Sequence, residues 1–199
     1  MNSVIKKEKG LEHFPKQVEL NKGTVELHLM TRADEQRMLS FAQALPEHDL
    51  MFLRRDITRP DVIEAWVDKI EAGGTVTVIA DKDGEMIGYG TLSFSDYSWS
   101  RHVAELRVMV RPDKRDSGAG RYLTREVFRL ALANGVEKMV ARMTLDQTAA
   151  RKLFQELGFR PEALLEDEVK DRHGELHDVL VMAVNVQAML AKRDAFGLG

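Results

Sequence analysis

A short glycine-containing turn is the clearest chemical signal in this 199-residue sequence. It runs from Arg115 to Arg121 and reads RDSGAGR, so Gly118 and Gly120 lie between two arginines. Glycine lacks the β-carbon that would keep a ligand from the backbone, and the first N–H groups of a helix have no intrahelical partner. With the positive end of the helix dipole, the turn predicts a site for a pyrophosphate. The alternative is that both glycines only relieve packing and that the arginines are solvated.

Two other glycine-rich nucleotide sites do not fit this turn. A Rossmann dinucleotide domain needs three spaced glycines near the start of a repeated parallel unit, and an acidic residue after the next strand. A P-loop needs Gly-Lys-Ser or Gly-Lys-Thr after the turn, whereas Arg121 follows Gly120 here. Both classes of site are excluded.

The flanking elements must hold the turn between a strand and a helix. Apolar periodicity predicts a strand over His102–Val110 and an amphipathic helix over Gly118–Asn134, and Pro112 ends the strand ladder between them. This order of elements predicts a mixed sheet with helices packed on it. The other expected strands are residues 24–30, 75–81, 85–94, 138–143, 164–171 and 177–184, with an edge strand near 18–20; the other helices are residues 35–45, 60–72, 147–157 and 185–193.

Composition limits the classes of function. With 44% apolar and 31% charged residues, the chain is expected to be soluble with one sizeable core, and a net charge of -3 gives no basic excess for nucleic acid or an anionic membrane. The absence of cysteine excludes disulfides, a thiolate nucleophile and sulfur-ligated zinc. A reducing, cytoplasmic location is expected, without secretion or a membrane span.

The turn resembles the cofactor motif of the GNAT superfamily of N-acetyltransferases. That motif is Arg or Gln, two residues, Gly, one residue, then Gly or Ala, and Arg115, Gly118 and Gly120 match it without insertion. The resemblance implies an α/β (α+β) fold with a mixed, mostly antiparallel central sheet flanked by helices and a splayed central strand pair. We therefore expect an N-terminal arm at 1–21, an acyltransferase domain at 22–185 and a helical C-terminal extension at 186–199.

The resemblance also implies acetyl-CoA as the co-substrate. The main-chain amides of the turn would hold its pyrophosphate, the splayed strand would pair with its pantetheine, and the next short helix would contribute two further contacts. The implied cofactor-binding residues are Val108, Met109, Val110, Arg115, Asp116, Ser117, Gly118, Ala119, Gly120, Arg121, Gln147 and Phe154.

The short helix departs from the family pattern at its polar positions. The family has Asn, two residues, Ala, three residues, Tyr, three residues and Gly-Phe; here Gln147 and Phe154 replace Asn and Tyr within the same frame. Phe154 has no hydroxyl and cannot act as a general acid, so its ring is expected in the core against the pantetheine. Because a free thiol has a pKa near 8.5, water can protonate the leaving thiolate.

Acyl transfer to an amine also needs a group that accepts the amine's proton. We nominate Glu105 as the catalytic base, since it lies in the strand that leads to the turn. The alternative is that Glu105 forms an ion pair with Arg107 on the same strand face. His102 is a second candidate, although a single histidine at a strand edge is more often ordinary surface.

The last predicted hairpin carries several groups that could ligate a metal, including His173 and His177 with Asp171, Glu175 and Asp178. A solvated polar hairpin explains them as well, and no metal site is expected. The acidic run Glu166 to Glu168 either attracts a cationic amine or keeps a strand soluble.

The expected function is transfer of an acetyl group from acetyl-CoA directly to a primary amine, either on a small molecule or on a protein lysine or N-terminus. A non-catalytic acyl-CoA-binding sensor is the alternative, because Phe154 and Gln147 replace polar positions. Acceptor specificity is expected from Glu47–Arg59 and from the last hairpin. The apolar positions of 184–196, Val186, Met189 and Leu190, either pack on their own domain or form a homodimer.

Overall fold

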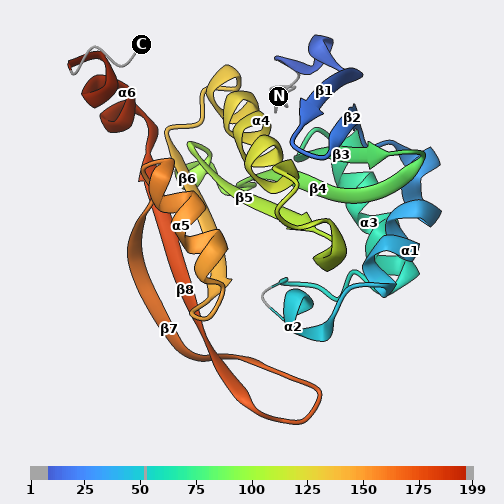
Figure 1. Cartoon of the computed structure of the whole chain (residues 1–199). Helices are drawn as coiled ribbons and strands as arrows, with labels where there is room; N and C mark the ends of the chain where they lie inside the picture. Colours follow the sequence, from blue (N-terminus) through green and yellow to red (C-terminus); the bar gives the residue numbers. More distant parts are fainter. Residues whose placement is uncertain (1–8, 52, 196–199) are drawn as a thin grey trace.

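The computed structural model describes residues 9–51 and 53–195, with side chains as far as residue 191, and contains one eight-stranded sheet (Figure 1). The strand order is β1-β2-β3-β4-β5-β6-β8-β7. All neighbouring strands are antiparallel except β5 and β6. The strands are β1 Lys16–Leu20, β2 Gly23–Leu29, β3 Thr75–Lys82, β4 Glu85–Phe94, β5 Val103–Val110, β6 Lys138–Thr144, β7 Arg160–Lys170 and β8 Leu176–Asn185.

Helices cover both faces of this sheet (Figure 1). On one face α4 and α5 enclose a large apolar core, and on the other α1 and α3 enclose a second core with β3 and β4. The fold therefore confirms the predicted mixed, mostly antiparallel sheet flanked by helices. The helices are α1 Glu35–Gln43, α2 Glu47–Leu50, α3 Pro60–Glu71, α4 Ala119–Ala133, α5 Thr148–Glu156 and α6 Val186–Ala195.

The two-residue period of the central strands supplies both cores. In β5 the side chains of Ala104 and Leu106 pack under α4, whereas Met109 packs on the other face. A β-carbon on Gly90 would lie 2.6 Å from Val127 Cγ2. Glycine at this position of β4 therefore lets the middle of α4 approach the sheet closely.

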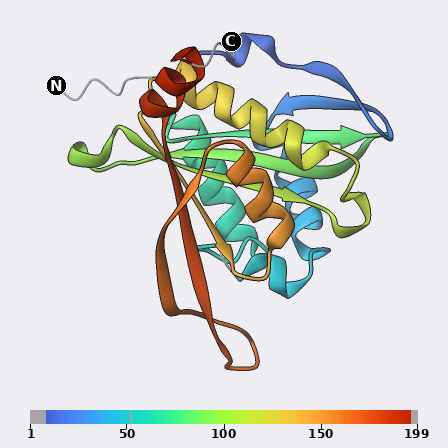
Figure 2. The same ribbon diagram turned by 60° about the vertical axis from the view of Figure 1, so that its left-hand side comes forward.

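The boundaries differ from the expected ones in a few places. Strand β7 begins at Arg160 rather than at residue 164, and it forms a long hairpin with β8 that extends beyond the rest of the sheet (Figure 2). A register shift at Pro161 and another before Val169 interrupt its pairing. The sequence also did not indicate α2, a single helical turn within the segment 47–59. Such a short helix has too few residues to show an amphipathic period.

The C-terminal helix packs against its own domain. Val186 is 1% exposed, and Met189 and Leu190 pack on the core beneath α4 and α5. The apolar stripe is therefore used within the chain, and a homodimer stays a prediction; Phe196 lies outside the described residues. Within the described ranges, no helix is both long and apolar enough to span a bilayer.

Tyr89 carries an unusual polar atom in the core beneath α1 and α3. Its ring makes edge contacts with Phe41 and Trp66, at centroid distances of 5.8 and 5.2 Å. The hydroxyl is buried and has no hydrogen-bond partner among the described residues. Burial raises the pKa of Tyr89 to about 12.

We expect Tyr89→Phe to stabilise the protein by about 1 kcal/mol at neutral pH, because it removes a buried hydroxyl that lacks a partner. Above pH 10 the unfolded chain releases the tyrosine proton while the folded chain keeps it, so the parent protein loses stability as pH rises from 10 to 12. The gap between variant and parent should therefore widen by on the order of 2 kcal/mol. Urea denaturation at pH 7, 10 and 11.5 measures this, and a constant gap would contradict it.

Candidate functional site

Strands β5 and β6 separate in the middle of the sheet. They pair in parallel only from Val103 with Lys138 to Glu105 with Val140. Beyond that point β5 stays paired with β4 as far as Val110, and β6 stays paired with β8 as far as Thr144. A gap therefore opens after Glu105, and the predicted splay of the central strand pair is present.

The gap exposes one backbone edge of β5. The carbonyl of His102 accepts hydrogen bonds from Glu137 and Lys138, so even-numbered peptide groups of β5 face β6. Because peptide groups alternate along a strand, those of Leu106 and Val108 face the gap where β6 has turned away. An extended ligand with amide groups can pair with this free edge.

The turn that follows β5 has the backbone of an anion site. A 3₁₀ turn, Pro112–Lys114, leads to Asp116 with φ of 62° and Gly118 with φ of 91°, and α4 begins at Ala119. The left-handed φ accounts for glycine at position 118. Gly120 is different, since its β-carbon would meet only Val110 Cγ2, at an ordinary 3.6 Å. Neither backbone conformation nor packing requires Gly120, so packing relief does not explain both glycines.

The amides of this turn are available to a ligand. The Ser117 hydroxyl accepts a hydrogen bond from Ala119 N–H at 3.3 Å. For the N–H groups of Gly118, Gly120 and Arg121 no acceptor is found in the described part of the chain. These groups lie at the positive end of the 15-residue helix α4.

Both arginines of the turn already have acidic partners. Arg115 Nη2 donates to Asp49 Oδ2 at 2.6 Å, and Arg121 Nη2 donates to Glu156 Oε2 at 2.6 Å. The Asp49 side chain is only 9% exposed, so its carboxylate competes with any anion for Arg115. The groups of the turn that remain available to an anion are therefore backbone amides rather than free guanidinium groups.

Three consecutive residues of α2 connect the segments around the gap. Glu47 accepts the backbone N–H of Arg172, at the tip of the β7–β8 hairpin, at 2.9 Å. His48 Nε2 lies 2.8 Å from Asp146 Oδ2, in the loop before α5. Asp49 holds Arg115 in the turn, as described above. Helix α2 thus forms a strap that connects the tip of the hairpin to the turn before α4.

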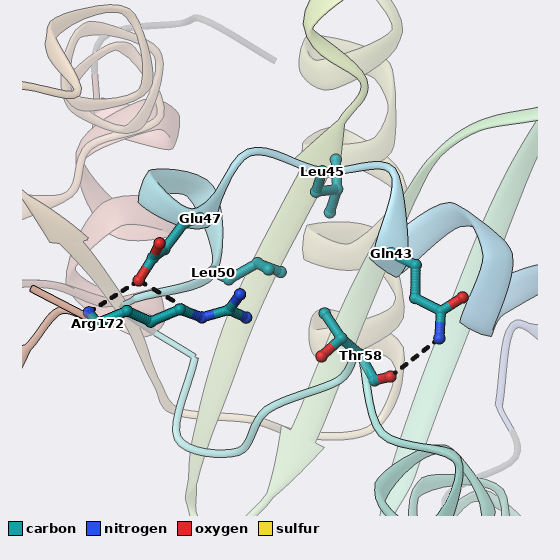
Figure 3. Close-up of a pocket in the computed structure, with 6 residues that line it drawn as sticks. All are labelled: Gln43, Leu45, Glu47, Leu50, Thr58 and Arg172. Carbon is teal, nitrogen blue, oxygen red and sulfur yellow. Dashed lines mark hydrogen bonds and ion pairs between the residues drawn. The ribbon is translucent and has the colours of Figure 1, made fainter.

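A cavity of about 270 Å³ lies beside this strap (Figure 3). Its wall joins the end of α1, the segment 47–59 and the hairpin tip. At one side the Gln43 amide donates to the carbonyl of Thr58 at 3.2 Å. The two segments expected to set acceptor specificity therefore meet in one place. The lining residues are Gln43, Leu45, Glu47, Leu50, Thr58 and Arg172.

Glu105 lies at the vertex of the splay, as the last residue of β5 that pairs with β6. Its Oε1 accepts a hydrogen bond from Arg107 Nη2 at 2.7 Å, and its Oε2 lies 3.2 Å from Arg54 Nη2. The ion pair with Arg107, the alternative to a catalytic role, is therefore present. A carboxylate has about four lone-pair sites, so these two contacts leave room for an amine or a water. His102 immediately precedes β5, where its carbonyl accepts hydrogen bonds from Glu137 and Lys138, on the side of the pairing away from the gap.

The two altered positions on α5 behave differently. Phe154 is 6% exposed and makes an edge contact with Phe159, at a centroid distance of 5.0 Å, within the core beneath α5. Gln147 is half-buried at the N-terminal end of α5, and its side chain makes no hydrogen bond with the described residues. Gln147 therefore keeps a side-chain amide without a partner among the described residues, whereas Phe154 offers no hydroxyl.

The polar side chains at the tip of the β7–β8 hairpin form the hydrogen bonds of its turn. Asp171 Oδ1 accepts the N–H groups of His173 and Glu175, both at 2.9 Å, and Asp171 Oδ2 lies 3.1 Å from His177 Nε2. Candidate ligand atoms of Asp171, Glu175 and His177 lie within 4.8 Å of one another. Turn hydrogen bonds account for this arrangement, and the absence of a metal site stays a prediction.

Sequence reasoning missed three charged residues at this site. Asp49 and Arg54 lie in a segment without periodicity, where no local signal distinguishes a buried charge from a solvated one. Arg142 had a signal, because it is the one charge within the apolar run from Met139 to Met143.

The chain resembles known acyltransferases in sequence and fold. A family model described as the acetyltransferase (GNAT) family matches residues 36–159. The L-amino acid N-acyltransferase MnaT of Escherichia coli (strain K12) is 32% identical over 98 residues, which cover 48% of this chain and 56% of that protein. The chain thus matches about half the length of this curated relative.

Solved structures share the fold. A GNAT superfamily phosphinothricin acetyltransferase from Sinorhizobium meliloti, in complex with acetyl-CoA, has a TM-score of 0.70 at 20% identity, covering 84% of this chain and 89% of its own. A putative acetyltransferase from Salmonella typhimurium with its cofactor acetyl-CoA has a TM-score of 0.67 at 21% identity, covering 80% of this chain and 94% of its own.

A substitution at Asp49 tests whether α2 holds the segment 47–59 against the turn before α4. We expect Asp49→Asn to weaken the contact with Arg115, to lower the free energy of unfolding by about 1 kcal/mol, and to speed tryptic cleavage after Arg54 or Arg55. Asp61→Asn is the matched control, because its ion pair with Arg59 is exposed on both sides. Urea denaturation and timed proteolysis measure both effects; equal cleavage rates in the two variants would contradict the strap.

Proposed function

Because the chain belongs to the acetyltransferase (GNAT) family, we propose that it transfers an acetyl group from acetyl-CoA directly to a primary amine. The observation that carries the proposal is that a free strand edge and an anion-binding turn lie consecutively in the chain, at one end of the β5–β6 gap. Such a pair fits a ligand with an amide-containing arm and a pyrophosphate.

The cofactor assignment follows this geometry. The pyrophosphate would accept hydrogen bonds from the amides of Arg115 to Arg121, and the pantetheine would pair with β5 from Val108 to Val110. Two structures with this fold hold acetyl-CoA, which supports the same donor here. The thioester would then lie near the vertex of the splay, where Glu105 is.

The reaction needs one new bond and one broken bond. The neutral amine attacks the thioester carbonyl carbon, a C–N bond forms, the C–S bond breaks, and CoA leaves as a thiolate. Glu105 accepts the proton that the amine loses, directly or through a water. Water protonates the thiolate, since Phe154 offers no hydroxyl.

A small acceptor fits the site better than a protein does. The strap formed by α2 crosses the approach to the gap, and the cavity beside it measures about 270 Å³. The relative MnaT is named an L-amino acid N-acyltransferase, which supports an amino acid as the acceptor. Multi-turnover thiol release with a panel of amines tests the proposal, and cofactor binding without turnover would favour the acyl-CoA sensor instead.

We expect Gly120→Val to lower acetyl-CoA affinity at least tenfold while the protein stays folded. A side chain at this position would project where the ligand must approach the amides, yet the fold leaves space for its β-carbon. Calorimetry gives the affinity and urea denaturation the stability, with Gly74→Ala, another glycine without positive φ, as the control. Unchanged affinity in the folded variant would rule out this site.

Glu105→Gln should lower kcat by about a hundredfold or more at neutral pH, the usual contribution of a general base, and leave acetyl-CoA affinity nearly unchanged. The readout is the pH–rate profile, which should differ from that of the parent protein. Glu162→Gln, which removes a surface carboxylate paired with Lys138, is the matched control. A variant that keeps the parent profile would show that another group takes the proton.

A further inference from the structure

Arg142 faces the gap from the strand opposite Glu105. Glu105 pairs in register with Val140, and side chains repeat on the same face every two residues. Arg107 and Arg142 therefore lie on the same face as Glu105, each two residues beyond the vertex, on the two strands that diverge. Their neighbours Leu106 and Ala141 point to the opposite face, into the core beneath α4 and α5.

The guanidinium of Arg142 has few hydrogen-bond partners among the described residues. Its side chain is 24% exposed, and its Nε is buried without a hydrogen-bond partner among the described residues. Its ion-pair partner is Glu168, whose Oε1 lies 3.5 Å from Nη1, beyond a strong hydrogen bond. Arg107, by contrast, donates to Glu105 at 2.7 Å. Since leaving a buried donor unsatisfied costs free energy, Arg142 is poised to bind an anion.

The charges on this face also favour the binding of an anion. Arg54 and Arg107 share the carboxylate of Glu105, and Arg142 has the distant carboxylate of Glu168. Among the ion pairs of the described residues on this face, three guanidinium groups thus share two carboxylates, which leaves an excess of one positive charge. Two residues of strand span about 7 Å, a distance that a small molecule with an amine at Glu105 and an anion at Arg142 can bridge.

We propose that Arg142 determines acceptor specificity by binding a carboxylate of the acceptor, whose amine lies at Glu105. This inference rests on the proposed N-acetyl transfer. It makes the acceptor a small amino acid rather than a simple amine. Glu168 occupies Arg142 when no acceptor is bound and gives it up to the acceptor carboxylate, which can use the fork-shaped donor pair of the guanidinium.

The experiment compares amino acids with the amines that lack only the carboxylate. The pairs are methionine with 3-(methylsulfanyl)propylamine, leucine with isopentylamine and phenylalanine with phenethylamine. Calorimetry in the presence of free CoA measures acceptor binding without turnover, and thiol release from acetyl-CoA measures kcat/KM. The preference for the carboxylated member, divided by that of the parent protein, cancels the different basicities of the two amines.

Three variants and a control follow from the contacts. Arg142→Met should reduce the preference about tenfold or more, as expected for lost hydrogen bonds to a charged group, and Arg142→Lys should reduce it partly, since an ammonium lacks the planar fork. Glu168→Gln should increase it, because the competing carboxylate is gone. Arg125→Met removes an exposed arginine of α4, on the other face of the sheet, and should change nothing.

The direction in which Arg142→Met and Glu168→Gln change the acceptor preference distinguishes a carboxylate-binding role from a structural one. If the Arg142–Glu168 pair were purely structural, Arg142→Met and Glu168→Gln would impair both acceptors in the same direction, and the inference would be overturned. It would also be overturned if the parent protein releases thiol with no preference for carboxylated acceptors, although the proposed acetyl transfer would stand. Carboxylate-dependent binding that Arg142→Met removes supports the inference even where no thiol is released.

Discussion

Hydrogen bonding between β5 and β6 stops at Glu105 and Val140, and each strand keeps only the ladder on its outer side. A buried parallel pair would normally continue, because unpaired backbone groups cost free energy. Here both strands have an unpaired edge at the gap, and that of β5 lies immediately before the turn at the start of α4. The site depends on this interruption, which leaves an edge for an extended ligand and places Glu105 at the vertex.

Charged contacts connect the elements around the gap. The three polar residues of α2 contact the hairpin, the loop before α5 and the pyrophosphate turn. Ion pairs of this kind, partly exposed, contribute modest free energy each. They can be exchanged for contacts with a ligand at little cost, which suits a strap over a groove. Asp49 illustrates this, since an anion at the turn would compete with it for Arg115.

The two faces of β5 and β6 carry different kinds of side chain. On the face of α4 and α5, the apolar residues Leu106, Ala141 and Phe154 are parts of a closed core. On the opposite face the same two strands present Glu105, Arg107 and Arg142. Backbone geometry thus sets the spacing between the proposed base, Glu105, and the proposed anion-binding residue, Arg142. The rigid core behind the strands preserves that spacing.

The sequence alone predicted the order of the elements except α2, the turn of Gly118 and Gly120, and the loss of the hydroxyl at Phe154. Each of these depends on local properties: side-chain period, the need for glycine at a left-handed φ, and the chemistry of one side chain. It also placed Glu105 on the correct strand and named Arg107 as its possible partner, because residues two apart share a strand face. The same reasoning needed no knowledge of the rest of the chain.

The contacts between charged residues could be seen only in the tertiary structure. Asp49 and Arg115 are far apart in sequence, but Arg115 Nη2 lies 2.6 Å from Asp49 Oδ2. No local pattern in the sequence predicts such a contact. The register of β5 against β6 decided that Arg142 faces the gap, because a shift of one residue would turn it into the core beneath α5. Long-range pairing depends on how the whole sheet closes, so the proposed acceptor site could be inferred only from the structure, whereas the local sequence was enough to predict the proposed cofactor site.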